Sequence, residues 1–177
     1  LNKNFKPNSG SLYSIGKEMK FKHQIDNLTV SNGIAWTKDN KTMYFIDSPS
    51  QEVKSYNFDS INNEITYNKV VIKISKELGA PDGMSIDKEG NLWIAHYGGH
   101  GVFCWNPKNG KILNKIMLPV PNVTSCCFGG ENLDYLMITT AMENLTKKEL
   151  KKFPLSGNTF IVKTKTQGFL SNKFNMN

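Results

Sequence analysis

One short sequence element occurs twice in this chain and constrains its fold more than any other feature. The segments Ser31–Trp36 and Pro81–Asp87 each place an oxygen-bearing side chain before a glycine at the start of an alternating apolar run, with Asn32 and Asp82 in equivalent positions. A ring of such repeats would direct several side-chain oxygens toward one central point. Because hard divalent cations prefer oxygen ligands, the repeat indicates a candidate cation site.

The similarity between the two copies extends beyond this element. In each copy a polar turn, a second apolar run and a further short strand follow, which is the pattern of a β-hairpin that continues into a sheet. A third copy begins near Val123, where Thr124 occupies the place of Asp82. The copies therefore start 50 and then 42 residues apart, at Asn32, Asp82 and Thr124.

A period of this length predicts an all-β chain and, within that class, a β-propeller. Blades of about 40 to 50 residues, built from four short antiparallel strands, match the spacing. Alternation and the many aromatic and β-branched residues argue against helical repeats. Thr146–Phe153 is the one segment that suggests a short helix, with Thr146 as its cap. A smaller open sheet of similar strands is the alternative.

The 177 residues are too few for a closed propeller of this period. They provide about three to four blades, whereas closed propellers have about four to eight, and each blade needs neighbours to cover its faces. We therefore expect residues 1–177 to form a single partial β-propeller whose amino-terminal blades are missing. The start at Leu1 instead of an initiator Met agrees with this expectation.

Composition restricts the partners. The net charge of +7 suggests a nucleic-acid ligand, but all 22 basic residues are lysine and none is arginine. Without guanidinium groups the bidentate recognition of guanine and phosphate is missing, so we expect no nucleic-acid partner. The densest lysine group, within residues 147–152, is expected to be a solvated face. No apolar run is long enough to span a bilayer, and no feature indicates an oligomeric state.

Cysteine and histidine residues give little support for disulfides, nucleophilic catalysis or a histidine metal site. Cys104, Cys126 and Cys127 make a poor disulfide framework, favour a reducing, cytoplasmic compartment, and are expected to be small buried residues. The sequence has neither a Gly-x-Ser-x-Gly elbow nor an HExxH motif. His96 and His100 are expected at the surface or at the rim of the central site, beside a glycine-rich turn.

Four segments together resemble the SMP-30/gluconolactonase family. They are Ser-Asn-Gly around Asn32, Pro-Asp-Gly-Met-Ser-Ile-Asp around Asp82, the strand Leu92–Ala95, and the TSCCFGG sequence of Thr124–Gly130. The resemblance covers roughly residues 10–141. It implies a six-bladed propeller, of which this chain would be roughly the carboxy-terminal half. This agrees with the shortfall of blades expected from the length.

The resemblance also implies a single divalent metal ion on the propeller axis, either Ca²⁺, Zn²⁺, Mn²⁺ or Mg²⁺. Its ligands would be Asn32, Asp82 and a Glu that lies upstream of Leu1. The family hydrolyses sugar lactones, and Asp82 would be both a metal ligand and the catalytic base. Because the Glu is absent, we expect this chain alone to be inactive. The alternative is that Asn32 and Asp82 are turn residues that cap strand starts.

Two positions depart from the family pattern. Lys6 stands where relatives have a substrate-contacting Glu, and Ala35 stands where many have an Asp three residues after the metal-binding Asn. Both differences bear on sugar specificity. The non-catalytic alternatives are a calcium-binding regulatory propeller and a platform for protein interactions. A tight calcium site supplies about six to eight oxygens, so the few ligands here favour catalysis.

Overall fold

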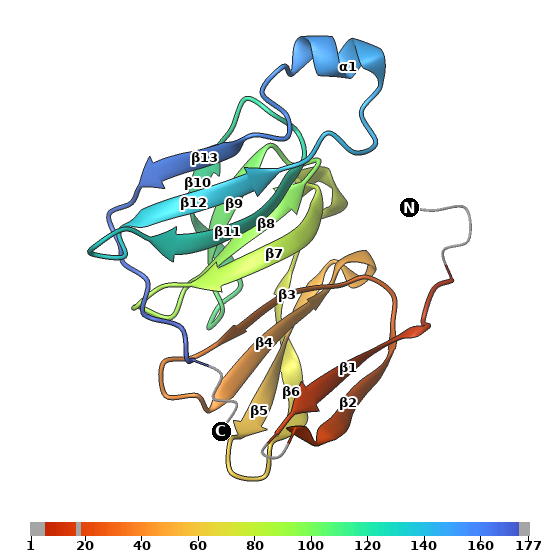
Figure 1. Ribbon diagram of the computed structural model, residues 1–177, viewed down its shortest axis with the longest axis vertical. Helices are drawn as coiled ribbons and strands as arrows, with labels where there is room; N and C mark the ends of the chain where they lie inside the picture. Colours follow the sequence, from red (N-terminus) through yellow and green to blue (C-terminus); the bar gives the residue numbers. More distant parts are fainter. Residues whose placement is uncertain (1–5, 17–18, 174–177) are drawn as a thin grey trace.

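The computed structural model describes residues 6–16 and 19–173 as a series of small sheets (Figure 1). In chain order the strands and the helix are β1 (Gly10–Ile15), β2 (Phe21–Leu28), β3 (Ser31–Trp36), β4 (Thr42–Asp47), β5 (Glu52–Asp59), β6 (Glu64–Lys73), β7 (Ala80–Ile86), β8 (Leu92–Tyr97), β9 (Gly101–Asn106), β10 (Lys111–Met117), β11 (Val123–Gly129), β12 (Tyr135–Thr140), α1 (Lys147–Lys152) and β13 (Thr159–Lys163). Single 3-10 turns, Ser48–Ser50 and Lys76–Leu78, follow β4 and β6.

The strands form four antiparallel sheets in which neighbours in the chain are also neighbours in the sheet. Strands β3–β6 and β7–β10 make two four-stranded blades, β11–β13 make a three-stranded sheet, and β1 and β2 form a separate pair. The innermost strands pack side by side, β3 against β7 and β7 against β11. The predicted fold class, an all-β chain that forms part of a β-propeller, is confirmed.

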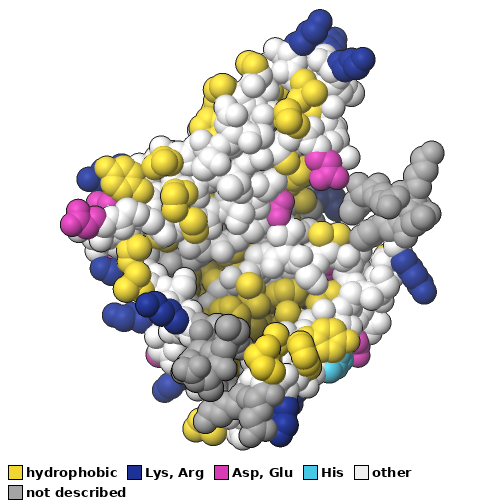
Figure 2. Space-filling model, viewed as in Figure 1, with side chains coloured by type: hydrophobic (Ala, Val, Ile, Leu, Met, Phe, Trp, Pro, Cys, Tyr) yellow, Lys and Arg dark blue, Asp and Glu magenta, His cyan; other side chains and the backbone are white. Residues whose placement is uncertain are grey.

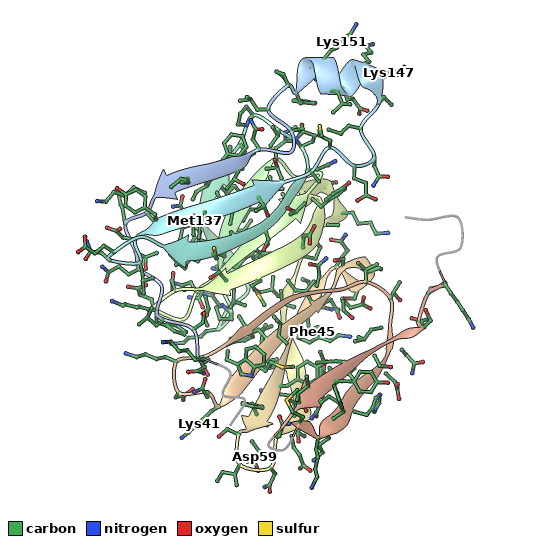
Figure 3. The ribbon with its side chains drawn as sticks, viewed as in Figure 1. Lys41, Phe45, Asp59, Met137, Lys147 and Lys151 are labelled. Atoms are coloured by element: carbon green, nitrogen blue, oxygen red, sulfur yellow. The ribbon has the colours of Figure 1, made fainter. Side chains whose placement is uncertain are left out.

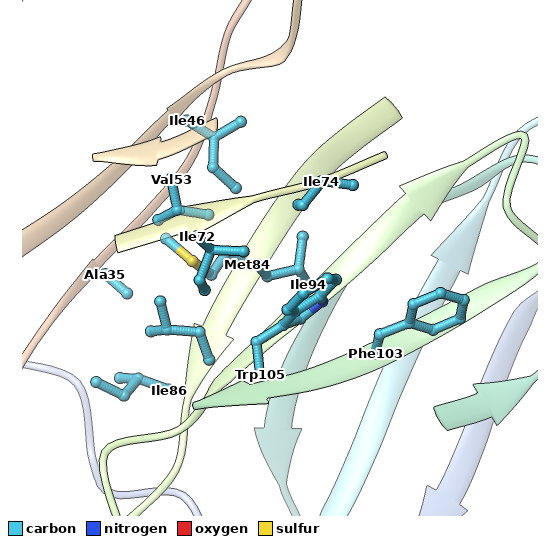
Figure 4. Packing of buried hydrophobic residues seen from close by; sticks show 11 residues of the cluster. Ala35, Ile46, Val53, Ile72, Ile74, Met84, Ile86, Ile94, Phe103 and Trp105 are labelled. Carbon is cyan, nitrogen blue, oxygen red and sulfur yellow. The ribbon is translucent and has the colours of Figure 1, made fainter. Parts of the chain in front are cut away.

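Buried hydrophobic side chains lie between consecutive sheets. The cluster shown in Figure 4 joins the two four-stranded blades: Ile46 and Val53 of one blade and Ile94 of the other are fully buried in it. A second cluster joins β7–β10 to β11–β13. A third, which includes the labelled Phe45 of Figure 3, lies between β1–β2 and β3–β6. Because apolar burial is the main stabilising contribution, each blade depends on its neighbour.

Glycine allows the innermost strands to approach one another. A methyl group at Gly33 would lie 2.6 Å from Met84 Cβ, and one at Gly83 would lie 2.2 Å from Ser125 Oγ. Real Cβ atoms do not come this close, so each position accommodates only a residue without a side chain. This packing explains why a glycine follows the oxygen-bearing residue in both copies of the repeated element.

The chain leaves the third sheet between β12 and β13 to form α1. The Thr146 hydroxyl accepts a hydrogen bond from the Glu149 amide at 3.3 Å, and the Thr146 amide donates to the Glu149 carboxylate at 2.8 Å. The short helix predicted at Thr146–Phe153 is confirmed. Its four lysines are exposed, and Figures 2 and 3 show them at the outer end of the molecule. In the described ranges no helix is long and apolar enough to cross a membrane.

Residues 164–173 return from β13 across the turn ends of the blades. This segment is hydrogen-bonded to the β7–β8 turn at Lys88, to the β11–β12 turn at Leu133 and to the β3–β4 turn at Asn40, over distances of 2.8, 2.9 and 2.9 Å. It therefore ties three sheets together at the end opposite to the one where β3 and β7 begin.

Candidate functional site

Asn32 and Asp82 lie near the starts of β3 and β7 and line one pocket of about 330 Å³. They are 50 residues apart in the sequence, and the packing of β3 against β7 brings them together. The other walls come from the 3-10 turn after β4, from the end of β8 and from the loop between β12 and α1. The end of the blades at which the repeated element begins is therefore the end that carries the pocket.

A β-bulge marks each of these strand starts. The register of β3 against β4 shifts between Ser31 and Ile34, and that of β7 against β8 shifts between Pro81 and Met84. β11 has a corresponding shift against β12 after Val123. Bulges redirect side chains at the rim of a sheet. Here Asn32 lies within the first bulge and Asp82 within the second, and both line the pocket.

Asn32 is held by a hydrogen-bond relay between the two blades. Its Nδ2 donates to Ser48 Oγ at 3.1 Å, and this hydroxyl donates to the Pro81 carbonyl oxygen at 2.6 Å. Because the amide nitrogen faces Ser48, Oδ1 is the Asn32 atom left to bind a ligand. Sequence reasoning missed Ser48. Its only signal is a position between Asp47 and Pro49, directly after an apolar strand.

The Asp82 carboxyl group has a raised pKa. Burial raises the pKa of Asp82 to about 6, while hydrogen bonds from the Asn32 side chain and the Gly83 backbone act in the opposite direction. A carboxyl group with a pKa in this range is suited to accept a proton near neutral pH. A cation beside it would favour the ionised carboxylate and lower its pKa.

The donor set fits a hard divalent cation in its chemistry, since one carboxylate and one amide oxygen are both ligands of this kind. In the part of the chain that the structure describes, no group of three or more His, Cys, Asp or Glu side chains could hold a metal ion. The third copy adds no ligand, because Thr124 Oγ1 lies 2.8 Å from Thr139 Oγ1 and Thr124 does not line the pocket. Asn32 and Asp82 would supply two ligands and leave positions for water and substrate.

A second group of polar residues in the pocket was not predicted from the sequence. Tyr97 ends β8, and Glu143 and Asn144 belong to the loop between β12 and α1. The Tyr97 hydroxyl donates to the Glu143 carbonyl oxygen at 2.9 Å and accepts from Asn144 Nδ2 at 3.0 Å. Asn122 Nδ2 also donates to the Glu143 carbonyl oxygen, at 2.9 Å. The loop is thus fixed in place where it borders the pocket.

The expectation that His96 lies at the surface or rim is wrong. Its side chain is 0% exposed; Nδ1 donates to the Leu78 carbonyl oxygen at 2.9 Å, and Nε2 accepts from Trp105 Nε1 at 3.2 Å. The ring stacks on Phe103 with centroids 4.1 Å apart. Burial lowers the pKa of His96 to about 4, opposed by the bond to Leu78 and reinforced by the charge of Lys115. His96 is a neutral core residue.

The remaining candidates do not enter the pocket. His100 is partly exposed and packs against Phe153, with ring centroids 5.5 Å apart. Cys104 and Cys126 are buried as predicted, but Cys127 is exposed, so the prediction is wrong for that residue. All three thiols are free.

The two departures from the family pattern have different surroundings. Lys6 is exposed and is not among the residues that line the pocket. Ala35 is 6% exposed and belongs to the hydrophobic cluster between the first two blades. Its methyl group therefore contributes to packing between blades.

These features define a partial β-propeller with a pocket at the end of its innermost strands, where Asn32 and Asp82 lie. Residues 1–142 match the model of one family of such proteins, described as the SMP-30/gluconolactonase/LRE-like region. The match covers most of the sequence, and the chain belongs to this family.

Individual relatives agree with this assignment. Regucalcin of Macaca fascicularis is 40% identical over 151 residues, which cover 85% of this chain and 50% of the relative. A structure of luciferin-regenerating enzyme is 34% identical, with a TM-score of 0.84 over 92% of this chain and 54% of the other. Regucalcin from Agrobacterium tumefaciens, described as a calcium-binding protein, shares the fold with a TM-score of 0.87 at 24% identity, over 96% of this chain and 57% of the other. The chain spans about half the length of the curated relatives it matches.

Proposed function

We propose that this chain is part of a divalent-metal-dependent lactonase that hydrolyses sugar lactones such as gluconolactone. The observation that carries the proposal is the single pocket lined by Asn32 and Asp82, the two positions that match the family's metal-binding pattern. The chain belongs to a family whose description includes gluconolactonase, and this supports lactone hydrolysis as the reaction class. The remaining blades, and a Glu that completes the ligand set, would come from sequence outside these 177 residues.

In this proposal each pocket residue has a defined task. A bound divalent cation supplies Lewis-acid polarisation of the lactone carbonyl. Asn32 Oδ1 and the Asp82 carboxylate would hold the cation, and the bond from Asn32 to Ser48 keeps the amide oriented. Asp82 takes a proton from a water molecule as the water oxygen bonds to the carbonyl carbon. The acyl–oxygen bond of the ring then breaks, the ring oxygen takes back the proton held by Asp82, and the open-chain hydroxy acid leaves.

The absence of a protein nucleophile is compatible with this reaction. A lactone is an activated ester, so its hydrolysis needs a polarised carbonyl and a base more than a covalent intermediate. The thiols offer no alternative, since burial raises the pKa of Cys104 to about 12 and none of the cysteines lines the pocket. Three free cysteines also suit the reducing, cytoplasmic compartment that we propose.

The test is hydrolysis of D-glucono-δ-lactone by the product of the complete transcript, with the 177-residue chain assayed in parallel. EDTA should abolish turnover, and Zn²⁺, Mn²⁺, Mg²⁺ or Ca²⁺ should restore it. Asp82→Asn removes the base and one ligand charge, so kcat should fall by about 100-fold or more while the fold is kept. Asp26→Asn, at an exposed position on β2, is the matched control and should retain full activity.

Two results would overturn parts of this proposal. Retained turnover in Asp82→Asn would remove Asp82 from the mechanism. If calorimetry shows that Ca²⁺ binds and that Asp82→Asn abolishes binding, while several lactones stay intact, the non-catalytic calcium-binding function should replace the lactonase.

A further inference from the structure

The pocket contains hydrogen-bond acceptors that the metal and base roles do not use. Gln51 Oε1 is buried and has no hydrogen-bond partner among the described residues, although Gln51 lines the pocket. In the same part of the chain, Asn144 Oδ1 and the Glu143 carboxylate accept no hydrogen bond from protein groups, and both exposed residues border the pocket. A few acceptors at the edge of a mainly apolar pocket suit a ligand with a carbon ring that carries hydroxyl groups.

Three hydrogen bonds hold the wall that carries two of these acceptors. The Tyr97 hydroxyl and Asn122 Nδ2 both donate to the Glu143 carbonyl oxygen, at 2.9 Å each. Asn144 gives its Nδ2 to Tyr97 at 3.0 Å, which orients the amide and leaves Oδ1 as its acceptor. Preorganised contacts of this kind lower the entropic cost of binding.

We propose that Tyr97 and Asn144 form a hydroxyl-recognition subsite, in which Asn144 determines specificity for polyhydroxylated lactones and Tyr97 positions it. The inference rests on the proposed lactonase function and adds the substrate feature that the pocket recognises. Asn144 Oδ1 accepts a hydrogen bond from a ring hydroxyl of the substrate. A site built to pair with a substrate hydroxyl discriminates against the analogue that lacks it, because its own polar groups are then left without partners.

The experiment compares D-glucono-δ-lactone with δ-valerolactone, a ring of the same size without hydroxyl groups, on the product of the complete transcript. Asn144→Gly is the informative variant, because Asn144 has a φ of 63° and glycine adopts this conformation without strain. We expect KM for the gluconolactone to rise about tenfold, kcat to change less than twofold, and kcat/KM for valerolactone to stay the same. Asn27→Gly, at an exposed asparagine with a φ of 59°, is the matched control.

Tyr97→Phe should change the same parameters in the same direction by a smaller factor, because Asn122 still holds the Glu143 carbonyl. Tyr67→Phe, at an exposed tyrosine on β6, should have no effect. Binding of D-glucitol, a polyol that cannot be hydrolysed, gives a second readout by saturation-transfer NMR. Asn144→Gly should weaken this binding by about tenfold.

The outcomes separate the two proposals. If the wild-type protein hydrolyses neither lactone but binds D-glucitol through Asn144, the lactonase function fails and hydroxyl recognition stands. If both lactones are hydrolysed and Asn144→Gly leaves the ratio of their kcat/KM values unchanged, the subsite is wrong and the lactonase stands. Equal losses for both lactones would show that Asn144 only supports the loop, and would also overturn the subsite.

Discussion

Acidification should destabilise this protein through His96. The ring is neutral in the folded state, where it bonds Leu78 and Trp105, and its pKa is lowered from 6.5 to about 4. The unfolded state therefore binds a proton more readily between these values, so the stability that His96 contributes is complete above about pH 6.5 and is lost as pH falls toward 4. At pH 5, protonation of His96 favours the unfolded state over the folded state by a factor of about 30. The free energy of unfolding should therefore fall by about 2 kcal/mol.

The assay is urea unfolding followed by tryptophan fluorescence at pH 7, 6 and 5, for the wild type and for His96→Gln. Glutamine keeps one donor and one acceptor but does not titrate, and subtracting its pH dependence removes the contribution of the carboxyl groups. His23→Gln, at an exposed histidine, is the control and should follow the wild type. A stability difference between wild type and His96→Gln that stays constant from pH 7 to 5 would refute the reasoning, as would an NMR titration of His96 near pH 6.5.

Two further predictions concern single contacts. Gly83→Ala places a methyl group 2.2 Å from Ser125 Oγ and should lower the free energy of unfolding by about 1–3 kcal/mol. At Gly90 a methyl group would meet nothing within 4 Å. Gly90→Ala should therefore lower the free energy of unfolding only through backbone strain at φ +83°, by about 1 kcal/mol. Equal effects of these two variants in urea unfolding would contradict the packing argument. Thr146→Ala removes the hydroxyl that accepts from the Glu149 amide, so hydrogen exchange in α1 should accelerate by about fivefold, while unchanged exchange would show that the cap contributes nothing.

The repeat predicted the fold because hairpin spacing and alternation are local properties. It also predicted that Asn32 and Asp82 would meet, since equivalent positions in adjacent blades lie at the same end of the sheets. The burial of His96 could not be predicted from the repeat. His96 lies near the end of β8, two residues before the first glycine of the turn, whereas its burial depends on Leu78 and Trp105, which approach it only in the folded state.

The loop that borders the pocket was not predicted from the sequence, for a related reason. Tyr97 and Asn144 are 47 residues apart, one at the end of β8 and the other in the loop after β12, and only the excursion between β12 and β13 brings them into contact. No repeat encodes this excursion, because the first two blades lack it. The resemblance to a family concerned the two positions proposed as metal ligands, Asn32 and Asp82, which the repeated element contains, and gave no indication of Tyr97 or Asn144.

The segment 164–173 has a consequence for the order in which contacts between the sheets form. Its bond to Asn40 spans 132 residues. On the ribosome the hairpins of the earlier sheets can form in sequence, but this bond cannot form until Asn172 has emerged. We therefore expect nascent chains that end at Lys163 to be cleaved by protease at the turns more readily than chains that extend through Asn172. The three sheets would then be joined at these turns well after each of them has folded.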